Sequence, residues 1–297
     1  MRIVPPQEVT ETVLQSTNVV NDYSDWVAGT YNLGDRVVYD NQVYEVVADP
    51  STTDQPDVGA AKTAPTWYVV GYSNQWRMFT KGQDSKTTAT GDIDVTLQWP
   101  SSITTIGVLG VMGTSVTVTV TDSVEGVVYN EAVDLVDIGV SGWWEWYFLE
   151  YEFDQVAIFS GIPPYAGADV RIIIEGASAS DNVACGRIIA GVERTLGVTQ
   201  YGTSIDKSSY STKDRDGFGN LTLVPRRTLK LVDFDVRVPT QMVDSVVTQL
   251  NKLDGIAALY IGDDSFGSTV VYGVQYDVSM GISTPSLSDL TVQVEEF

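Results

Sequence analysis

Carboxylates are the residues of this chain whose type and spacing best fit chemistry. The sequence of 297 residues holds 39 acidic residues, one cysteine and no histidine. The acidic residues that are near neighbours include Asp92 with Asp94, Asp214 with Asp216, and Asp263 with Asp264. Two carboxyl groups about 5–9.5 Å apart across a cleft can hydrolyse a glycosidic bond. Carboxylates in a turn can instead bind calcium, for which the candidates are Asp263 with Asp264 or, as an alternative, Asp214 with Asp216.

The remaining composition argues against an enzyme. Without histidine the chain cannot build a histidine-based triad or dyad, nor most zinc and iron sites. It also has no phosphate-binding loop, dinucleotide fingerprint or nucleophile elbow. Neighbouring acids arise by chance among so many, and two acids in one turn do not face each other across a cleft. We therefore expect no enzymatic activity, no cofactor, and solvated turns at Asp214 with Asp216 and at Asp263 with Asp264. A glycosidase is the weakest alternative.

Charge narrows the possible partners. The net charge is −22 and the isoelectric point is about 4.1, so the surface repels nucleic acid and anionic membranes. No apolar run approaches the ~18 residues of a membrane span, and the first ten residues lack the apolar core of a secretion signal. The single Cys185 lies in an apolar run and is predicted to be a small buried residue.

Hydrophobic alternation and turn signals predict a mainly β protein in four parts. Residues 1–22 are an extended arm, predicted to pack on a later domain or on a neighbouring subunit. Residues 23–72 form a small β module, and residues 73–192 an antiparallel β-sandwich with turns every 8–12 residues. Residues 193–297 form an α+β domain with one helix on an antiparallel sheet.

The small module is the most distinctive stretch. Residues 36–39 and 42–47 read as two strands joined by the turn residues Asp40 and Asn41. Five aromatic residues accompany them, namely Trp26, Tyr31, Tyr39, Tyr44 and Trp67. A core of this size can bury two or three of these rings, so the others are expected at the surface.

The spacing of these residues carries a resemblance. The pattern W-x4-Y-x2-GD-x-V-x-Y-x4-Y over residues 26–44, followed by Pro65 and Trp67, resembles the small chitin-binding (type 5/12-like) modules of chitinases and cellulases. The same module recurs near the N-termini of virion proteins of tailed bacteriophages. The resemblance implies glycan binding by ring stacking at Trp26, Tyr31, Tyr44 and Trp67. The alternative is a folded spacer without a ligand.

The predicted sandwich contains the densest aromatic cluster of the chain. Its strands are expected near residues 93–97, 116–120, 127–133, 168–176 and 185–192, in a jelly-roll arrangement like that of galactose-binding domains. In residues 143–153 aromatic residues alternate with acids, as on a strand with one exposed face. Trp143, Trp146 and Tyr147 are candidate protein-interface residues. The alternative is ordinary core with an aromatic edge.

The last third combines a basic arm with a helix. Residues 201–227 are predicted to be a long hairpin, whose candidate interface residues are Lys207, Lys213, Arg215, Arg226 and Arg227. The strand 229–238 precedes a helix that begins at the N-cap Thr240 and ends at Gly255. Strands 257–261, 269–279 and 288–297 follow. The pattern of residues 74–297 resembles tail and adaptor proteins of tailed phages that carry the module described above.

Together these features predict a structural protein of a phage virion. We expect a homo-oligomeric tail or fibre-attachment adaptor that docks to other tail, connector or fibre proteins and assembles in the host cytoplasm. A basic arm on an acidic chain can pair with the acidic face of another copy. The alternative is a host-attachment protein that binds surface polysaccharide through the N-terminal module. Neither hypothesis involves nucleic acid or a membrane.

Overall fold

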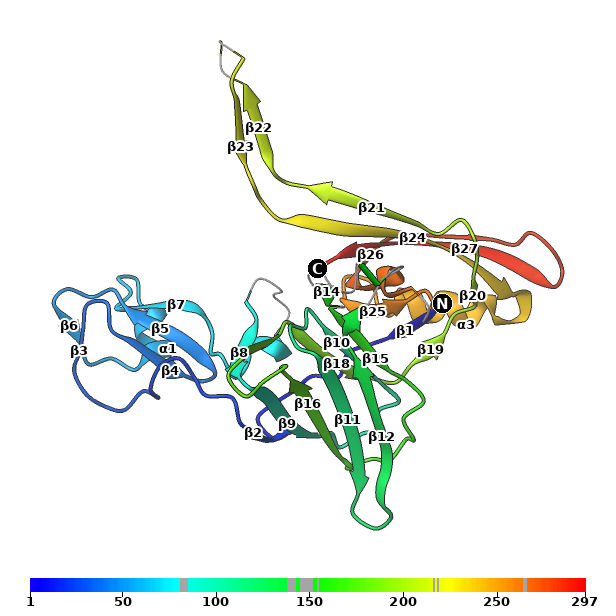
Figure 1. The fold of residues 1–297 in the computed structure, drawn as a ribbon. Coiled ribbons are helices and arrows are strands. Elements are labelled where there is room, and N and C mark those ends of the chain that lie inside the picture. Colours follow the sequence, from blue (N-terminus) through cyan, green and yellow to red (C-terminus); the bar gives the residue numbers. More distant parts are fainter. Residues whose placement is uncertain are drawn as a thin grey trace.

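The computed structural model describes residues 1–80, 85–137, 143–144, 152–153, 155–215, 217, 219–263 and 266–297. The protein is mainly β, its sheets are antiparallel, and the described chain contains one helix longer than two turns. Figure 1 shows a small module on one side, a central group of sheets, and a C-terminal sheet from which a long hairpin projects. No helix in the described ranges has the length and apolar character of a membrane span.

The small module follows the sequence prediction closely. Strands β4 (Arg36–Tyr39), β5 (Gln42–Val46) and β7 (Trp67–Tyr72) form one sheet, β3 (Tyr31–Asn32) pairs with β6 (Ser51–Thr52), and α1 (Pro56–Ala60) is a single helical turn. Asp40 and Asn41 join β4 to β5 with φ values of 47° and 64°. Two consecutive positive φ values are what a tight two-residue hairpin requires, and Asp and Asn tolerate them. The predicted hairpin is therefore confirmed.

Two sheets of the central region share one hydrophobic core. The first contains β12 (Gly126–Asp134), β11 (Ser115–Asp122), β16 (Asp169–Glu175), β9 (Asp92–Gln98) and β2 (Leu14–Thr17) in that order. The second contains β15 (Val156–Phe159), β10 (Thr105–Leu109) and β18 (Arg187–Gly191). Shorter pairs are β8 (Thr87–Thr90) with β17 (Asn182–Cys185), and β13 (Val136–Asp137) with β14 (Glu152–Phe153). Between the small module and these sheets lies the 3-10 turn η1 (Arg77–Phe79).

The C-terminal sheet has eight strands. Its order is β19 (Arg194–Thr195), β1 (Arg2–Val4), β25 (Ala258–Ile261), β26 (Val270–Gly281), β27 (Leu287–Glu296), β24 (Thr228–Pro239) and β20 (Val198–Thr199), with β21 (Ser204–Ser209) also paired to β24. The helix α3 (Val243–Asn251) places Val246 and Leu250 on one face of this sheet, against Phe234 and Tyr260.

The start of that helix differs from the prediction. Thr240 does not cap α3, since residues Thr240–Met242 form the 3-10 turn η2 and the N-cap position falls on Met242. The Thr240 hydroxyl instead donates a hydrogen bond to the carbonyl of Thr284, 3.1 Å away. The Thr240 side chain therefore bonds to a distant part of the chain and does not cap the helix. The end also differs from the prediction: α3 ends at Asn251 with Lys252 as its C-cap, and Gly255, with a φ of 70°, lies in the turn that follows.

The three-stranded sheet is covered on both faces. Alternate residues of β10 and β18, such as Val108 and Ile188, face the five-stranded sheet. Their neighbours Leu109 and Ile189 face the C-terminal sheet, where they pack with Leu259. Gly107 is needed at this second contact, because a Cβ there would lie 2.6 Å from the Leu259 side chain. Strands that are covered on both faces in this way typically consist almost entirely of apolar residues.

The N-terminal residues hold the outer sheets together. Strand β1 pairs with β25 and β19, so the first residues of the chain lie inside a sheet otherwise built from residues 194–296. Strand β2 extends the five-stranded sheet beside β9. The expectation that residues 1–22 pack on a later domain is met here within the same chain.

We expect Ile3→Asp to destabilise the C-terminal sheet strongly. Ile3 is completely buried in the core beneath α3, so the substitution would bury an unpaired charge at a cost of about 3–5 kcal/mol. Urea unfolding should show this loss. Val20→Asp in the same N-terminal segment, at a residue 79% exposed, should change the free energy of unfolding by less than about 0.5 kcal/mol. Equal stability of the two variants would contradict the placement of β1.

Candidate interaction surfaces

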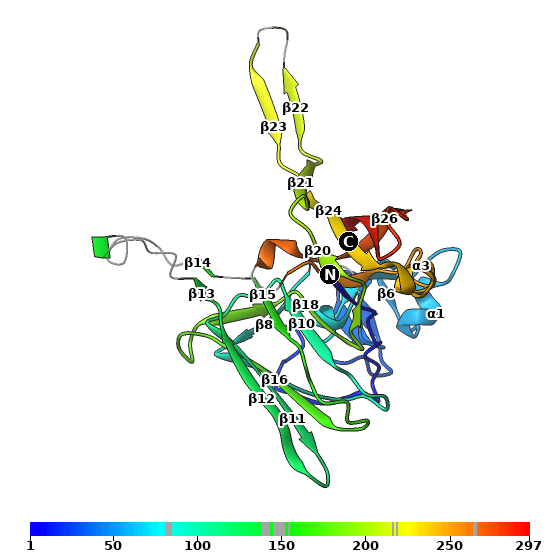
Figure 2. The ribbon, with the colours of Figure 1, turned by 90° about the vertical axis from the view of Figure 1, so that its right-hand side faces the viewer.

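The basic arm is one long bent hairpin. Its root is formed by β21 paired with β24, and its outer part by β22 (Thr212–Arg215) paired with β23 (Leu221–Val224). At the bend, the amide of Tyr210 donates to the carbonyl of Arg227 at 3.1 Å, so the ladder continues from root to tip. Figure 2 shows the outer part pointing away from the body, as Figure 1 does from the side.

The outer part of the arm exposes both of its faces. Every residue of β22 and β23 is exposed. Lys213 lies opposite Leu223, and Arg215 lies opposite Leu221. Residues opposite each other in an antiparallel pair point to the same face, and so do residues two apart on one strand. One face of the ribbon therefore carries two leucines and two cations, while the other carries Thr212, Asp214, Thr222 and Val224.

The charge of the arm is opposite to that of the chain. Residues 201–227 contain five basic residues and three acidic residues, in a chain with a net charge of −22. Of the predicted interface residues, Lys207 lies on β21 at the root, opposite Lys230. Arg226 and Arg227 lie at the bend, where the Arg227 guanidinium donates to the carbonyl of Phe297. The structure thus distributes the five predicted basic residues along the full length of the arm.

The aromatic segment is described only in part. Trp143 and Trp144 are 79% and 65% exposed, and their backbone is helical where a strand was expected. The other two predicted interface residues of this segment, Trp146 and Tyr147, lie outside the described residues.

The predicted sugar-stacking residues of the module include two that are buried. Trp67 is 1% exposed and Tyr44 is 6% exposed, and both belong to the module core with Val37 and Val46. Stacking on a sugar needs an open ring face, so these two residues are corrected from ligand contacts to core residues. The resemblance identified four aromatic positions but did not determine which of their rings are exposed.

Trp26 and Tyr31 are half-buried and packed edge-on. The ring of Trp26 lies 5.6 Å from that of Tyr39, and the ring of Tyr31 lies 5.4 Å from that of Trp67, both in T-shaped geometry. The Tyr31 hydroxyl also donates to the carbonyl of Val27 at 2.8 Å. Edge-to-face packing satisfies the rings among themselves. The four motif residues therefore form no common flat platform.

The segment between β6 and β7 closes over this core. The indole of Trp67 donates to the carbonyl of Asp54 at 3.0 Å, and the Asp54 carboxylate accepts from Lys62 and Thr66. The Lys62 ammonium and the Thr66 hydroxyl hold the pKa of Asp54 below its usual range. The aromatic rings that the module does expose are Tyr68 and Tyr72, on β7. Sequence analysis missed them, although strand alternation after Trp67 was an available signal.

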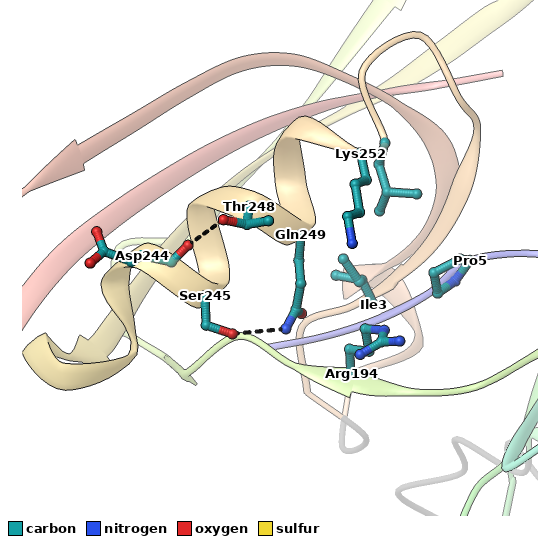
Figure 3. Close-up of a pocket in the computed structure, with 9 residues that line it drawn as sticks. Ile3, Pro5, Arg194, Asp244, Ser245, Thr248, Gln249 and Lys252 are labelled. Carbon is teal, nitrogen blue, oxygen red and sulfur yellow. Dashed lines mark hydrogen bonds between the residues drawn. The ribbon is translucent and has the colours of Figure 1, made fainter.

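A hollow of about 550 Å³ lies between α3 and the N-terminal residues. Figure 3 shows Asp244, Ser245, Thr248, Gln249 and Lys252 of the helix on one side, and Ile3, Pro5 and Arg194 on the other. The Gln249 amide donates to the Ser245 hydroxyl at 3.3 Å, and the Thr248 hydroxyl donates to the carbonyl of Asp244 at 2.7 Å. Two hydrogen bonds thus form within the helix, while Gln249 Oε1 is buried without a hydrogen-bond partner among the described residues.

The cavities give little support to carboxylate chemistry. Among the described residues, each of four cavities is lined by one carboxylate, namely Asp244, Glu296, Asp263 or Glu8. A glycosidase needs two. Within the same described ranges, no three Asp, Glu or Cys side chains come together as a metal site would require. Asp263, one of the two candidate calcium ligands, binds Thr269 through its backbone amide and carbonyl, and Asp264 lies outside the described residues.

One functional candidate was missed by the sequence analysis. Arg187 is 3% exposed and lies at the start of β18, between the three-stranded sheet and the C-terminal sheet. The available signal was a single arginine in the apolar run around Cys185.

Cys185 itself is a core residue. Burial raises the pKa of the Cys185 thiol to about 12, as expected for an inert core cysteine.

Comparison with known proteins adds no relative: no family model, no curated protein and no solved structure matches this chain.

Proposed function

We propose that this chain is a structural component of a tailed-phage virion, acting as a homo-oligomeric adaptor in the tail or at the fibre attachment. The observation that carries the proposal is the outer ribbon of the arm, whose described residues are all exposed although two leucines and two cations share one face. The motif resemblances of residues 26–67 and 74–297 supply the virion context.

The physics of a two-stranded ribbon supports an assembled state. An isolated hairpin is marginally stable in water, and its two open edges and exposed leucines favour association. Packing Leu221 and Leu223 against a neighbour would bury apolar surface and order the ribbon. Lys213 and Arg215 on the same face favour an acidic partner surface, and the rest of this chain supplies one because its net charge is strongly negative.

For the central region we propose a β-sandwich of the jelly-roll kind found in galactose-binding-like domains. Two antiparallel sheets with a common core support it, since Val95, Val118 and Ile172 of one sheet pack with Ile106 and Phe159 of the other. In the proposed assembly this region and the C-terminal sheet are the body from which the small module and the arm extend in different directions (Figure 1).

One observation supports a second candidate function, the binding of host-surface polysaccharide. Tyr68 and Tyr72 on β7 are exposed, and exposed tyrosine rings can cover the apolar face of a sugar. This candidate now rests on those two rings and no longer on Tyr44 and Trp67.

The test of the adaptor proposal is the solution mass. We expect light scattering to show a defined oligomer at micromolar concentration, and negative-stain electron microscopy to show a closed ring or trimer. Because cationic arms would meet acidic surfaces, raising sodium chloride from about 0.05 to 0.5 M should weaken the association through screening. A monomer at every concentration and salt would contradict the homo-oligomeric adaptor.

A further inference from the structure

A cavity of about 220 Å³ lies between the three-stranded sheet and the C-terminal sheet. Three of its lining residues are basic, Lys86, Arg187 and Lys230, and Glu296 is the one carboxylate among the described lining residues. In the whole chain the ratio is reversed, with 39 acidic against 17 basic residues. Positive charge is therefore concentrated at this cavity against the trend of the protein.

Arg187 is the centre of this cluster. Its guanidinium lies 4.2 Å from the centre of the Tyr272 ring, so the ring covers one of its planar faces. None of its three nitrogens has a hydrogen-bond partner among the described residues, although all are buried. The same side chain lines a second cavity of about 260 Å³, again with Tyr272. Among the described residues its N–H groups thus have no acceptor, and the side chain lines both cavities.

This charge cannot be removed by losing a proton. Burial lowers the pKa of Arg187, and the nearby Arg227 lowers it further. The guanidinium nevertheless remains protonated at physiological pH, because its pKa in water is above 12. A buried cation that stays charged needs a counter-charge or an equivalent set of acceptors.

The other groups of the cavity do not supply that counter-charge. The Glu296 carboxylate accepts from the backbone amide of Lys230 at 3.0 Å and is not bonded to Arg187. The Lys230 ammonium donates to the carbonyl of Val270 at 3.0 Å. Lys86 also lines the cavity and lies beside Gly110, where a Cβ would be in ordinary contact with Lys86 Cε at 3.6 Å.

We propose that this cavity binds one small oxyanion, a phosphate or a short carboxylate, between Arg187 and Lys86. The fork of a guanidinium matches two oxygens of a carboxylate or phosphate, which a spherical anion such as chloride does not offer. The cavity volume suits a small free anion. The site is independent of the adaptor proposal, since it lies between two sheets of one chain and not on the arm.

The test uses the full chain with inorganic phosphate and malonate as probes, and sodium chloride at equal ionic strength as reference. We expect calorimetric titration to find one site per chain for at least one probe, with a matching rise in melting temperature. Arg187→Met should weaken binding by at least about tenfold, because charge-assisted hydrogen bonds are lost. Arg237→Met removes the same charge at an exposed residue that lines neither cavity, and this variant should bind as the unmodified protein does. The comparison of phosphate with malonate decides between the two kinds of oxyanion.

A second variant protects the test against a folding defect of Arg187→Met. Lys86 is only partly buried, so Lys86→Gln should fold normally and weaken the same binding by about threefold or more through loss of one cation. The proposal is overturned if neither probe binds better than chloride, or if binding persists unchanged in both Arg187→Met and Lys86→Gln.

Discussion

Replacing Leu221 and Leu223 together by aspartate should convert the proposed oligomer into a monomer. Both leucines are more than half exposed and lie on the face of the arm that also carries Lys213 and Arg215. A few apolar anchors contribute most of the free energy of a protein interface. Two carboxylates in their place would lose that packing and would be repelled by an acidic partner, so we expect at least about 100-fold weaker association, near 3 kcal/mol.

The control for this variant lies on the same strand. Thr222 is exposed between the two leucines and points to the opposite face of the ribbon. Thr222→Asp adds a carboxylate without touching the apolar face, so light scattering should show it assembling like the unmodified protein. Urea unfolding of either variant as a monomer should change by no more than about 0.5 kcal/mol, since surface positions are tolerant. Assembly that survives the double aspartate variant would show that the arm is not the interface.

Trp67→Ala should unfold the small module while the rest of the chain stays folded. The Trp67 side chain is fully buried, packs edge-on with Tyr31 and donates to Asp54. Removing a buried tryptophan costs about 3–5 kcal/mol. A module of about 50 residues buries little surface and has a small free energy of unfolding, so one such loss is enough. Hydrogen exchange should show loss of protection in β4, β5 and β7 with protection retained in β9 and β16.

Tyr68→Ala is the matched control for this prediction. Tyr68 is the next residue of the same strand and is 65% exposed, so its removal should leave the amide protection of the module unchanged. If the module binds polysaccharide, Tyr68→Ala should weaken adsorption in a folded protein, whereas Trp67→Ala would abolish it by unfolding. Full protection in Trp67→Ala would contradict the placement of this ring in the core.

The local elements of the fold were predictable because their signals are local. The turn at Asp40 and Asn41, the strand 229–238 and the apolar face of the helix at Val246 and Leu250 each depend on neighbours within a few residues. The hairpin at residues 201–227 was predictable for the same reason, since both of its strands flank one turn. Thr240 shows where local signals fail. Its sequence context predicts a helix cap, but its hydroxyl donates a hydrogen bond to a carbonyl 44 residues away.

The sequence by itself determined the mainly β character, the helix on the C-terminal sheet, the basic hairpin and the aromatic content of the small module. Only the tertiary structure decided that β1 lies between β19 and β25, more than 190 residues away along the chain. It also decided that Trp67 is core while Tyr68 is surface, and that Arg187 is buried without a hydrogen-bond partner among the described residues. The physical reason is that alternation defines two faces of a strand, but which face is covered, and by what, depends on packing between segments far apart in sequence.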